Sequence, residues 1–126
     1  MTIGETAAVF YAILAVPPAF MQLALAAGAP FGEYTLGGRW PGKLPHAMRP
    51  VALLQACILI TMATAVLDRS GVIELGWPAA AWWLAFAMTV LTCIANLATP
   101  SRPERRVWGP ITVAMLVCVL AVWLTN

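Results

Sequence analysis

Four long apolar stretches divide the chain, and none of them contains an Asp, Glu, Lys, Arg or His residue. They run over about residues 7–27, 51–67, 78–98 and 111–124. A helix that crosses a bilayer needs roughly 17 to 25 mostly apolar residues. We therefore expect each stretch to be a membrane-spanning helix, with the shorter second and fourth stretches gaining a turn from flanking residues.

The composition excludes the other common classes of protein. Only 10% of the residues are charged and 62% are hydrophobic, whereas soluble domains carry roughly a quarter charged residues. The same values exclude a disordered chain, and a formal net charge of +2 gives no reason to expect a nucleic-acid partner. The predicted fold is an all-α membrane protein, a single domain over residues 1–126 that forms an antiparallel four-helix bundle.

The basic residues predict the orientation of this bundle in the membrane. Six of the seven Lys and Arg residues fall in the two connections that lie on one side, namely Arg39, Lys43, Arg49, Arg102, Arg105 and Arg106. Connections rich in Lys and Arg face the cytoplasm in membrane proteins. We therefore expect both termini to lie outside, and we expect a bacterial inner membrane as the location.

Prolines suggest where the helices begin. Pro50, Pro78 and Pro110 stand near the starts of the last three apolar stretches, and the first turn of a helix tolerates proline because its N–H has no intrahelical acceptor. Pro17 and Pro18 fall inside the first stretch, where they are expected to kink the helix.

The first cytoplasmic connection is long and rich in glycine. It contains five of the nine glycines, which are Gly28, Gly32, Gly37, Gly38 and Gly42. Two interpretations stay open. It could be a lid or binding loop in which the backbone N–H groups of residues 37–39 bind an anion, or an interfacial connector anchored by its aromatic residues.

The second cytoplasmic connection has three arginines beside the bilayer. Arg102, Arg105 and Arg106 would either bind a phosphate or an anionic lipid headgroup or serve only to set the topology. Ser101 and Glu104 have the spacing of a capping box, which predicts a short helical turn before the fourth span.

The few strong hydrogen-bonding side chains in the spans lie at one depth. Gln22, Gln55, Asn96 and Thr112 all fall within roughly 10 Å of the cytoplasmic interface, since a helix rises about 1.5 Å per residue. Amides exposed to lipid are costly, so we expect them to face the bundle interior. They would either line a pocket that opens to the cytoplasm or form interhelical hydrogen bonds that fix the register of the helices.

The titratable residues give only weak candidates for catalysis. Glu33, His46 and Glu104 would lie at the mouth of such a pocket. His46 is the only histidine, and the three cysteines, which lie in three different spans, have no CxxC spacing. We therefore expect no metal site and no cofactor.

Several motifs along the chain together resemble a group of small four-helix membrane proteins from actinobacteria and related bacteria. The motifs are Gly28-Ala29-Pro30-Phe31-Gly32, Gly37-Gly38, Leu44-Pro45, Asn96, Ser101-Arg102-Pro103-Glu104-Arg105 and Trp108-Gly109-Pro110. The resemblance spans nearly the whole chain and implies the same architecture and a bacterial source. It implies no activity and no site residues.

The leading hypothesis is a non-enzymatic protein that binds or carries a lipid or small amphipathic molecule at a polar pocket on the cytoplasmic side. The candidate ligand-binding residues are Gln22, Gln55, Asn96, Arg39, Arg102, Arg105 and Arg106. The alternatives are an intramembrane enzyme for a lipophilic substrate, with Glu33, His46 and Glu104 as acid–base groups, and a structural subunit of a membrane complex. The expected partners are membrane lipids, and a homo-oligomer or larger membrane complex is possible.

Overall fold

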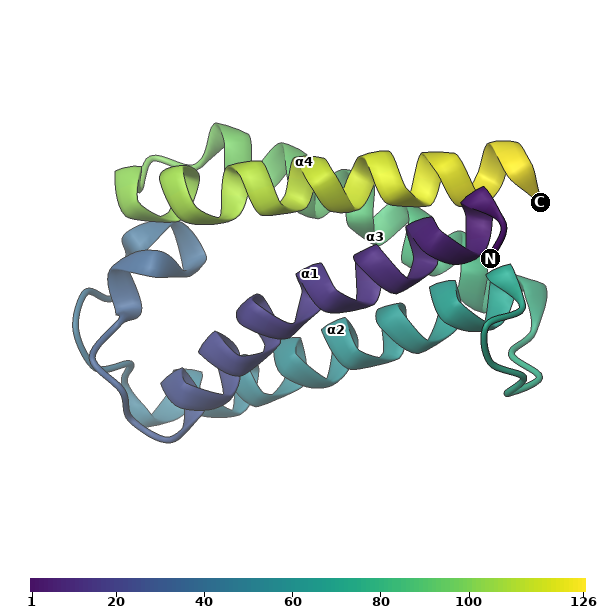
Figure 1. Ribbon diagram of the computed structural model, residues 1–126. Helices are drawn as coiled ribbons and strands as arrows, with labels where there is room; N and C mark the ends of the chain where they lie inside the picture. The colour runs from purple at the N-terminus through teal and green to yellow at the C-terminus, as the bar shows by residue number, and fades with distance from the viewer.

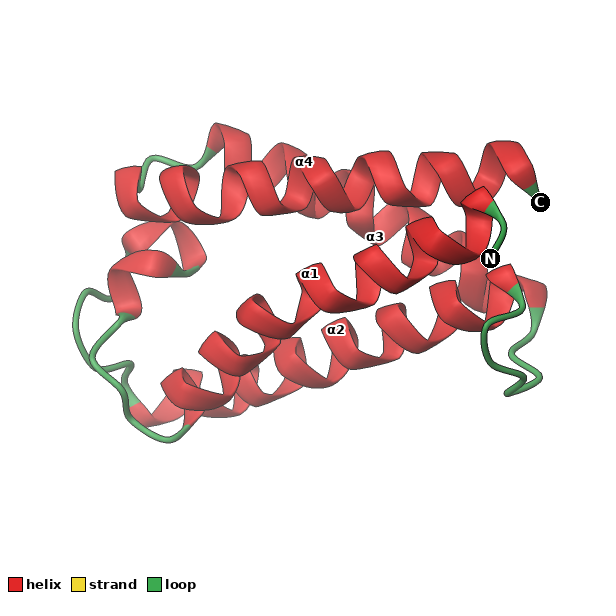
Figure 2. Cartoon of the chain, in the orientation of Figure 1, coloured by secondary structure: helices red, strands yellow, loops and turns green.

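Four long helices and no strands make up the protein in the computed structural model, which describes all 126 residues. They are α1 (Ile3–Ala26), α2 (Arg49–Ser70), α3 (Ala79–Ala98) and α4 (Arg102–Thr125). Each is long and apolar enough to cross a membrane. The predicted all-α architecture is therefore confirmed, with four helices of the length and apolarity that a membrane span requires (Figure 2).

The predicted helix starts are correct for α2 but not for α4. Pro50 lies in the first turn of α2, and Pro78 is the residue that caps α3. Pro110, in contrast, lies inside α4, which begins eight residues earlier in the chain at Arg102. Ser101 therefore caps the spanning helix itself and not a separate short turn, and its Oγ accepts a hydrogen bond from the Glu104 N–H at 3.3 Å.

The helices form a ring in which α1 packs on α2 and α4, and α3 packs on α4 and α2. The contact between α2 and α3 is the least extensive of the four. Both termini and the connection 71–78 lie at one end of the bundle, here called the termini end, whereas the long connection 27–48 lies at the other, the loop end (Figure 1). Toward the loop end, α1 and α2 lean away from α4 (Figure 1).

Small residues bring α1 and α2 close together. On α1, Ala8 and Ala15 are buried, and on α2, Ala56 and Ala65 are buried. Membrane helices associate through such small residues because their backbones can then approach closely. This pair is the most extensive helix contact in the molecule.

The packed core lies in the half of the bundle near the termini end. Its large buried side chains are Tyr11, Met62, Val66, Trp82, Met115, Val119 and Val122. A smaller cluster of Leu25, Leu44 and Ala52 fixes the connection 27–48 against α1 and α2 at the loop end. Between the two clusters the four helices do not fill the space.

The connection 27–48 contains three short 3-10 turns: η1 (Gly32–Tyr34), η2 (Leu36–Gly38) and η3 (His46–Met48). Its first half folds back beneath the start of α4 (Figure 1). Gly32 permits the chain to cross itself closely here, since a Cβ at this position would clash with the Trp40 carbonyl oxygen. The connection is thus a compact structure that closes the loop end.

Candidate ligand-binding cavity

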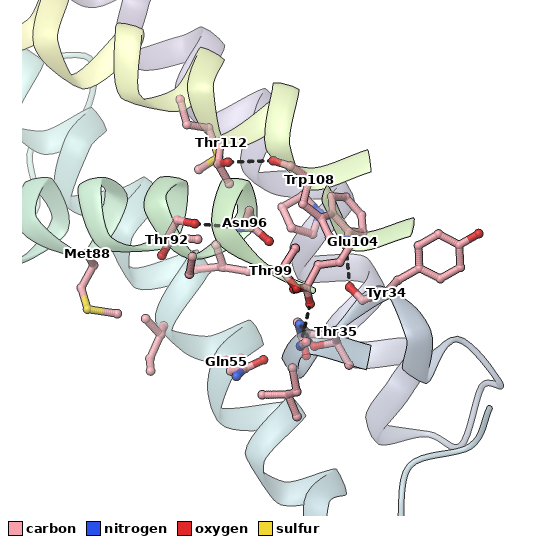
Figure 3. A pocket seen from close by; sticks show the side chains of 18 of the residues that line it. Tyr34, Thr35, Gln55, Met88, Thr92, Asn96, Thr99, Glu104, Trp108 and Thr112 are labelled. Atoms are coloured by element: carbon pink, nitrogen blue, oxygen red, sulfur yellow. Dashed lines mark hydrogen bonds between the residues drawn. The ribbon is translucent and has the colours of Figure 1, made fainter. Parts of the chain in front are cut away.

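A cavity of about 480 Å³ lies between the packed core and the connection 27–48. It is lined by 22 residues that come from all four helices, from residues 34–37 and from residues 98–100 (Figure 3). Small-molecule sites in proteins commonly have volumes of roughly 300 to 1,000 Å³. The cavity is therefore large enough for a small ligand or for part of a lipid.

The lining changes from polar to apolar along the helix axes. Toward the loop end it presents Gln22, Thr35, Gln55, Asn96, Thr99 and Glu104, and deeper in the bundle it presents Ile58, Leu59, Met62, Met88 and Met115. Thr112 lies in the deeper part, but its hydroxyl donates to the Trp108 carbonyl at 2.7 Å. The Thr89 hydroxyl is bonded as well, to the Ala85 carbonyl, so the deep part of the cavity is mainly apolar.

Three amide side chains, those of Gln22, Gln55 and Asn96, line the polar part of the cavity with unused hydrogen-bonding capacity. Figure 3 labels Gln55 and Asn96. Gln22 donates to Thr35 Oγ1 at 3.2 Å, but its own Oε1 is buried without a partner. Asn96 donates only to the Thr92 carbonyl of its own helix, at 2.9 Å. No hydrogen bond joins the Gln55 amide to the rest of the chain.

The amide layer makes no hydrogen bonds between spanning helices. Gln22 bonds to the connection 27–48 and Asn96 to its own helix, so no hydrogen bond of the kind expected by the register interpretation is present. Gln22, Gln55, Asn96 and Thr112 all line one cavity. The connection 27–48 forms the wall of this cavity at the loop end, where the pocket interpretation expected an opening.

Three hydrogen bonds join the connection 27–48 to the first turns of α4. Trp108 Nε1 donates to the Tyr34 carbonyl at 2.8 Å, and Ser101 Oγ donates to the Glu33 carbonyl. The Gly37 N–H donates to Glu104 Oε2 at 3.3 Å. The connection therefore forms the wall of the cavity at the loop end.

Residues 36–38 all adopt left-handed backbone conformations. Their φ angles are 51° for Leu36, 69° for Gly37 and 73° for Gly38. Glycine adopts this region readily, whereas leucine does so only at an energetic cost. This geometry directs the Gly37 N–H at the Glu104 carboxylate. One interpretation of the sequence was an anion bound by the backbone N–H groups of residues 37–39. In the structure, the anionic group that accepts from the Gly37 N–H is the carboxylate of Glu104.

Glu104 is the only charged residue that lines the cavity. Its side chain is 8% exposed, and it lies in the first turn of α4, where the helix dipole favours a negative charge. The Gly37 N–H provides the one hydrogen bond that its carboxylate accepts. The second carboxylate oxygen has no partner in the chain.

The arginines predicted to bind a ligand do not line the cavity. Arg39, Arg102, Arg105 and Arg106 are all exposed. The reason is the early start of α4: at about 100° per residue, the stripe that holds Glu104 and Trp108 faces inward and the three arginines face outward. Arg105 donates to the Thr99 carbonyl at 2.9 Å, and Arg39 lies over the Trp40 ring.

The three candidate acid–base residues are also separated. Glu33 accepts a hydrogen bond from the Gly42 N–H at 3.3 Å and does not line the cavity. His46 is exposed in η3, just before α2. Of the three, only Glu104 reaches the cavity.

Sequence reasoning missed the contribution of residues 34–37 and of the deep methionines. The contacts of residues 34–37 depend on how the long connection folds, for which the sequence pattern gives no rule. The inward face of α4 could have been found from the sequence. A helix capped by Ser101 places four lining residues on one stripe at spacings of four, four and three, namely Glu104, Trp108, Thr112 and Met115.

Comparison with protein-family models, with curated proteins and with solved structures gave no significant match. The resemblance to small actinobacterial four-helix membrane proteins therefore stays an expectation. Any function must be argued from the cavity.

Proposed function

We propose that this protein binds a lipid or a small amphipathic molecule in the cavity, as a carrier or as a ligand-binding subunit of a membrane complex. In this proposal the loop end faces the cytoplasm of a bacterial inner membrane. The observation that carries it is the set of unused amide groups of Gln22, Gln55 and Asn96, which converge on a single cavity that has an apolar floor.

The buried and unpaired Oε1 of Gln22 has an energetic consequence. A buried polar group without a partner costs about 1 to 3 kcal/mol, and within a bilayer there is little water to compensate it. A polar headgroup placed among the three amides would supply the missing hydrogen bonds. Its apolar part would lie against Ile58, Leu59 and the methionines.

The loose packing of α2 on α3 supports access from the bilayer. These helices make the least extensive of the four neighbouring contacts. Met88 and Ala95 line the cavity and are nevertheless exposed on the surface of α3. A lipophilic ligand would therefore reach the cavity sideways between α2 and α3.

The enzymatic alternative lacks support from the site. It required Glu33, His46 and Glu104 to act together, but only Glu104 lines the cavity. The alternative of a purely structural subunit predicts a protein that carries no retained ligand, which makes the two hypotheses separable by experiment.

The test is native mass spectrometry of the protein released from a gentle membrane extract. We expect the wild-type chain to retain a lipid or small molecule. Asn96→Leu removes one of the amides, and Thr92→Trp fills the cavity beside it, so both variants are expected to lose this ligand while still folding.

Leu91→Trp is the matched control, because Leu91 precedes Thr92 on α3 but is 59% exposed and does not line the cavity. This variant is expected to retain the ligand. A wild-type chain that appears bare, or only in complex with another protein, would contradict the proposed function and favour a structural subunit.

A further inference from the structure

The charge of the cavity lining constrains the headgroup of the ligand. No Lys, Arg or His side chain lines the cavity, and Glu104 contributes a single negative charge at its polar end. An anionic headgroup placed there would meet a carboxylate and no compensating cation. A cationic headgroup would meet a counter-ion.

Glu104 has the structural features of a counter-ion that lacks its partner. It is 8% exposed, and its carboxylate accepts one hydrogen bond, from the Gly37 N–H. A buried carboxylate normally requires an opposite charge or several hydrogen bonds, because its desolvation is expensive. The dipole of α4 and the Gly37 N–H provide part of this compensation, and the free oxygen is left available to a ligand.

The neighbours of Glu104 suit an ammonium group as well. Gln22 Oε1 is a buried acceptor without a donor, and the Asn96 amide oxygen is free. Trp108 contributes an aromatic side chain to the same end of the cavity, and aromatic rings attract cations. Besides the remaining N–H groups of its amides, the polar end thus offers a carboxylate, free amide acceptors and the Trp108 ring, and its one formal charge is negative.

We propose that the cavity takes an amphiphile with a cationic nitrogen headgroup, for which Glu104 is the counter-ion. This inference rests on the proposed function and specifies its ligand class. The exposed arginines at the loop end would attract anionic headgroups to the outer surface of the protein, so binding must be assigned to the cavity and not to that surface.

The test uses the full chain in a neutral detergent and three probes that share a hexadecyl tail: hexadecylamine, hexadecanol and hexadecanoate. Binding to the cavity is the part of the binding that Thr92→Trp abolishes and Leu91→Trp leaves intact. We expect hexadecylamine to bind the wild-type chain about tenfold more tightly than hexadecanol, which corresponds to about 1.4 kcal/mol, and hexadecanoate to bind most weakly.

Glu104→Gln is the decisive variant, because glutamine can still accept the Gly37 hydrogen bond but has no charge. We expect it to bind hexadecylamine about as weakly as hexadecanol. The control is Glu33→Gln, which neutralises a carboxylate outside the cavity and is expected to keep the preference for the amine. If Glu104→Gln does not fold, the relative affinities of the wild-type chain for the three probes test the inference about the headgroup without this variant.

The outcomes separate the two proposals. Equal binding of the three probes, or tightest binding of hexadecanoate, overturns the inference about the headgroup but leaves a ligand-binding cavity. If Thr92→Trp changes the binding of none of the three probes, both proposals are overturned.

Discussion

Tyr11 and Thr89 join α1 to α3 across the centre of the packed half. Both side chains are buried, and their hydroxyl oxygens lie 2.7 Å apart. The Thr89 hydroxyl donates its one proton to the Ala85 carbonyl, so Tyr11 must be the donor to Thr89. This contact fixes the relative positions of two helices that are not neighbours in the ring.

Tyr11→Phe is expected to lower the free energy of unfolding by about 0.6 to 1 kcal/mol, the range of such bonds in membrane and soluble proteins. The loss is modest because Thr89 keeps its bond to Ala85. Thermal unfolding in detergent measures it, and Tyr34→Phe is the control, since no hydrogen bond is made by the Tyr34 hydroxyl. Equal melting of Tyr11→Phe and the wild-type chain would show that the bond contributes nothing.

At the scale of elements, Ser101 connects two parts of the structure. Its Oγ caps α4 by accepting from the Glu104 N–H, and it also donates to the Glu33 carbonyl in the connection 27–48. The start of α4 and the wall of the cavity therefore depend on one hydroxyl group.

Ser101→Ala is expected to cost about 1 kcal/mol for the lost cap and to loosen the connection. Hydrogen exchange should become faster both in the first turn of α4 and in residues 32–38. Thr2→Ala is the matched control, because Thr2 caps α1 in the same way at the termini end. It should accelerate exchange in the first turn of α1 alone. Unchanged exchange in residues 32–38 of Ser101→Ala would contradict this role.

The elements also show what the sequence could predict. The spans followed from length and apolarity, and the depth of Gln22, Gln55 and Asn96 followed from the helical rise, because both quantities depend only on local geometry. Arg102, Arg105 and Arg106 were predicted to lie in a connection because Pro110 was taken as the start of a helix, whereas they belong to the first turns of α4. Membrane helices tolerate internal proline, so the cap at Ser101 was the better guide to the start of α4.

The bundle is packed at one end and hollow at the other. The termini end contains the main core, and the cavity lies toward the loop end. The division follows from the lean of α1 and α2 away from α4 (Figure 1). Six of the seven Lys and Arg residues lie at the hollow end. In the proposed function, the headgroup of a ligand would therefore lie on the same side of the membrane as the basic connections.

A topology experiment tests this orientation. A phosphatase reporter that is active only outside the cytoplasm is expected to be active when fused after Asn126 and inactive when inserted beside Lys43. The physical reason is the asymmetry of the Lys and Arg residues between the two sides. The reverse pattern would place the polar end of the cavity on the outer side of the membrane.

The meeting of the two termini has a consequence for biogenesis. Gly4 lies against the side chain of Asn126, which also donates to the Arg69 carbonyl at 3.0 Å. The connection 71–78 lies at the same end (Figure 1). A gene permuted to start in that connection, with residues 126 and 1 joined by a short linker, would encode α3 and α4 before α1 and α2. Each helix pair would keep the Lys and Arg residues that set its orientation. The two pairs are therefore expected to insert into the membrane correctly in either order.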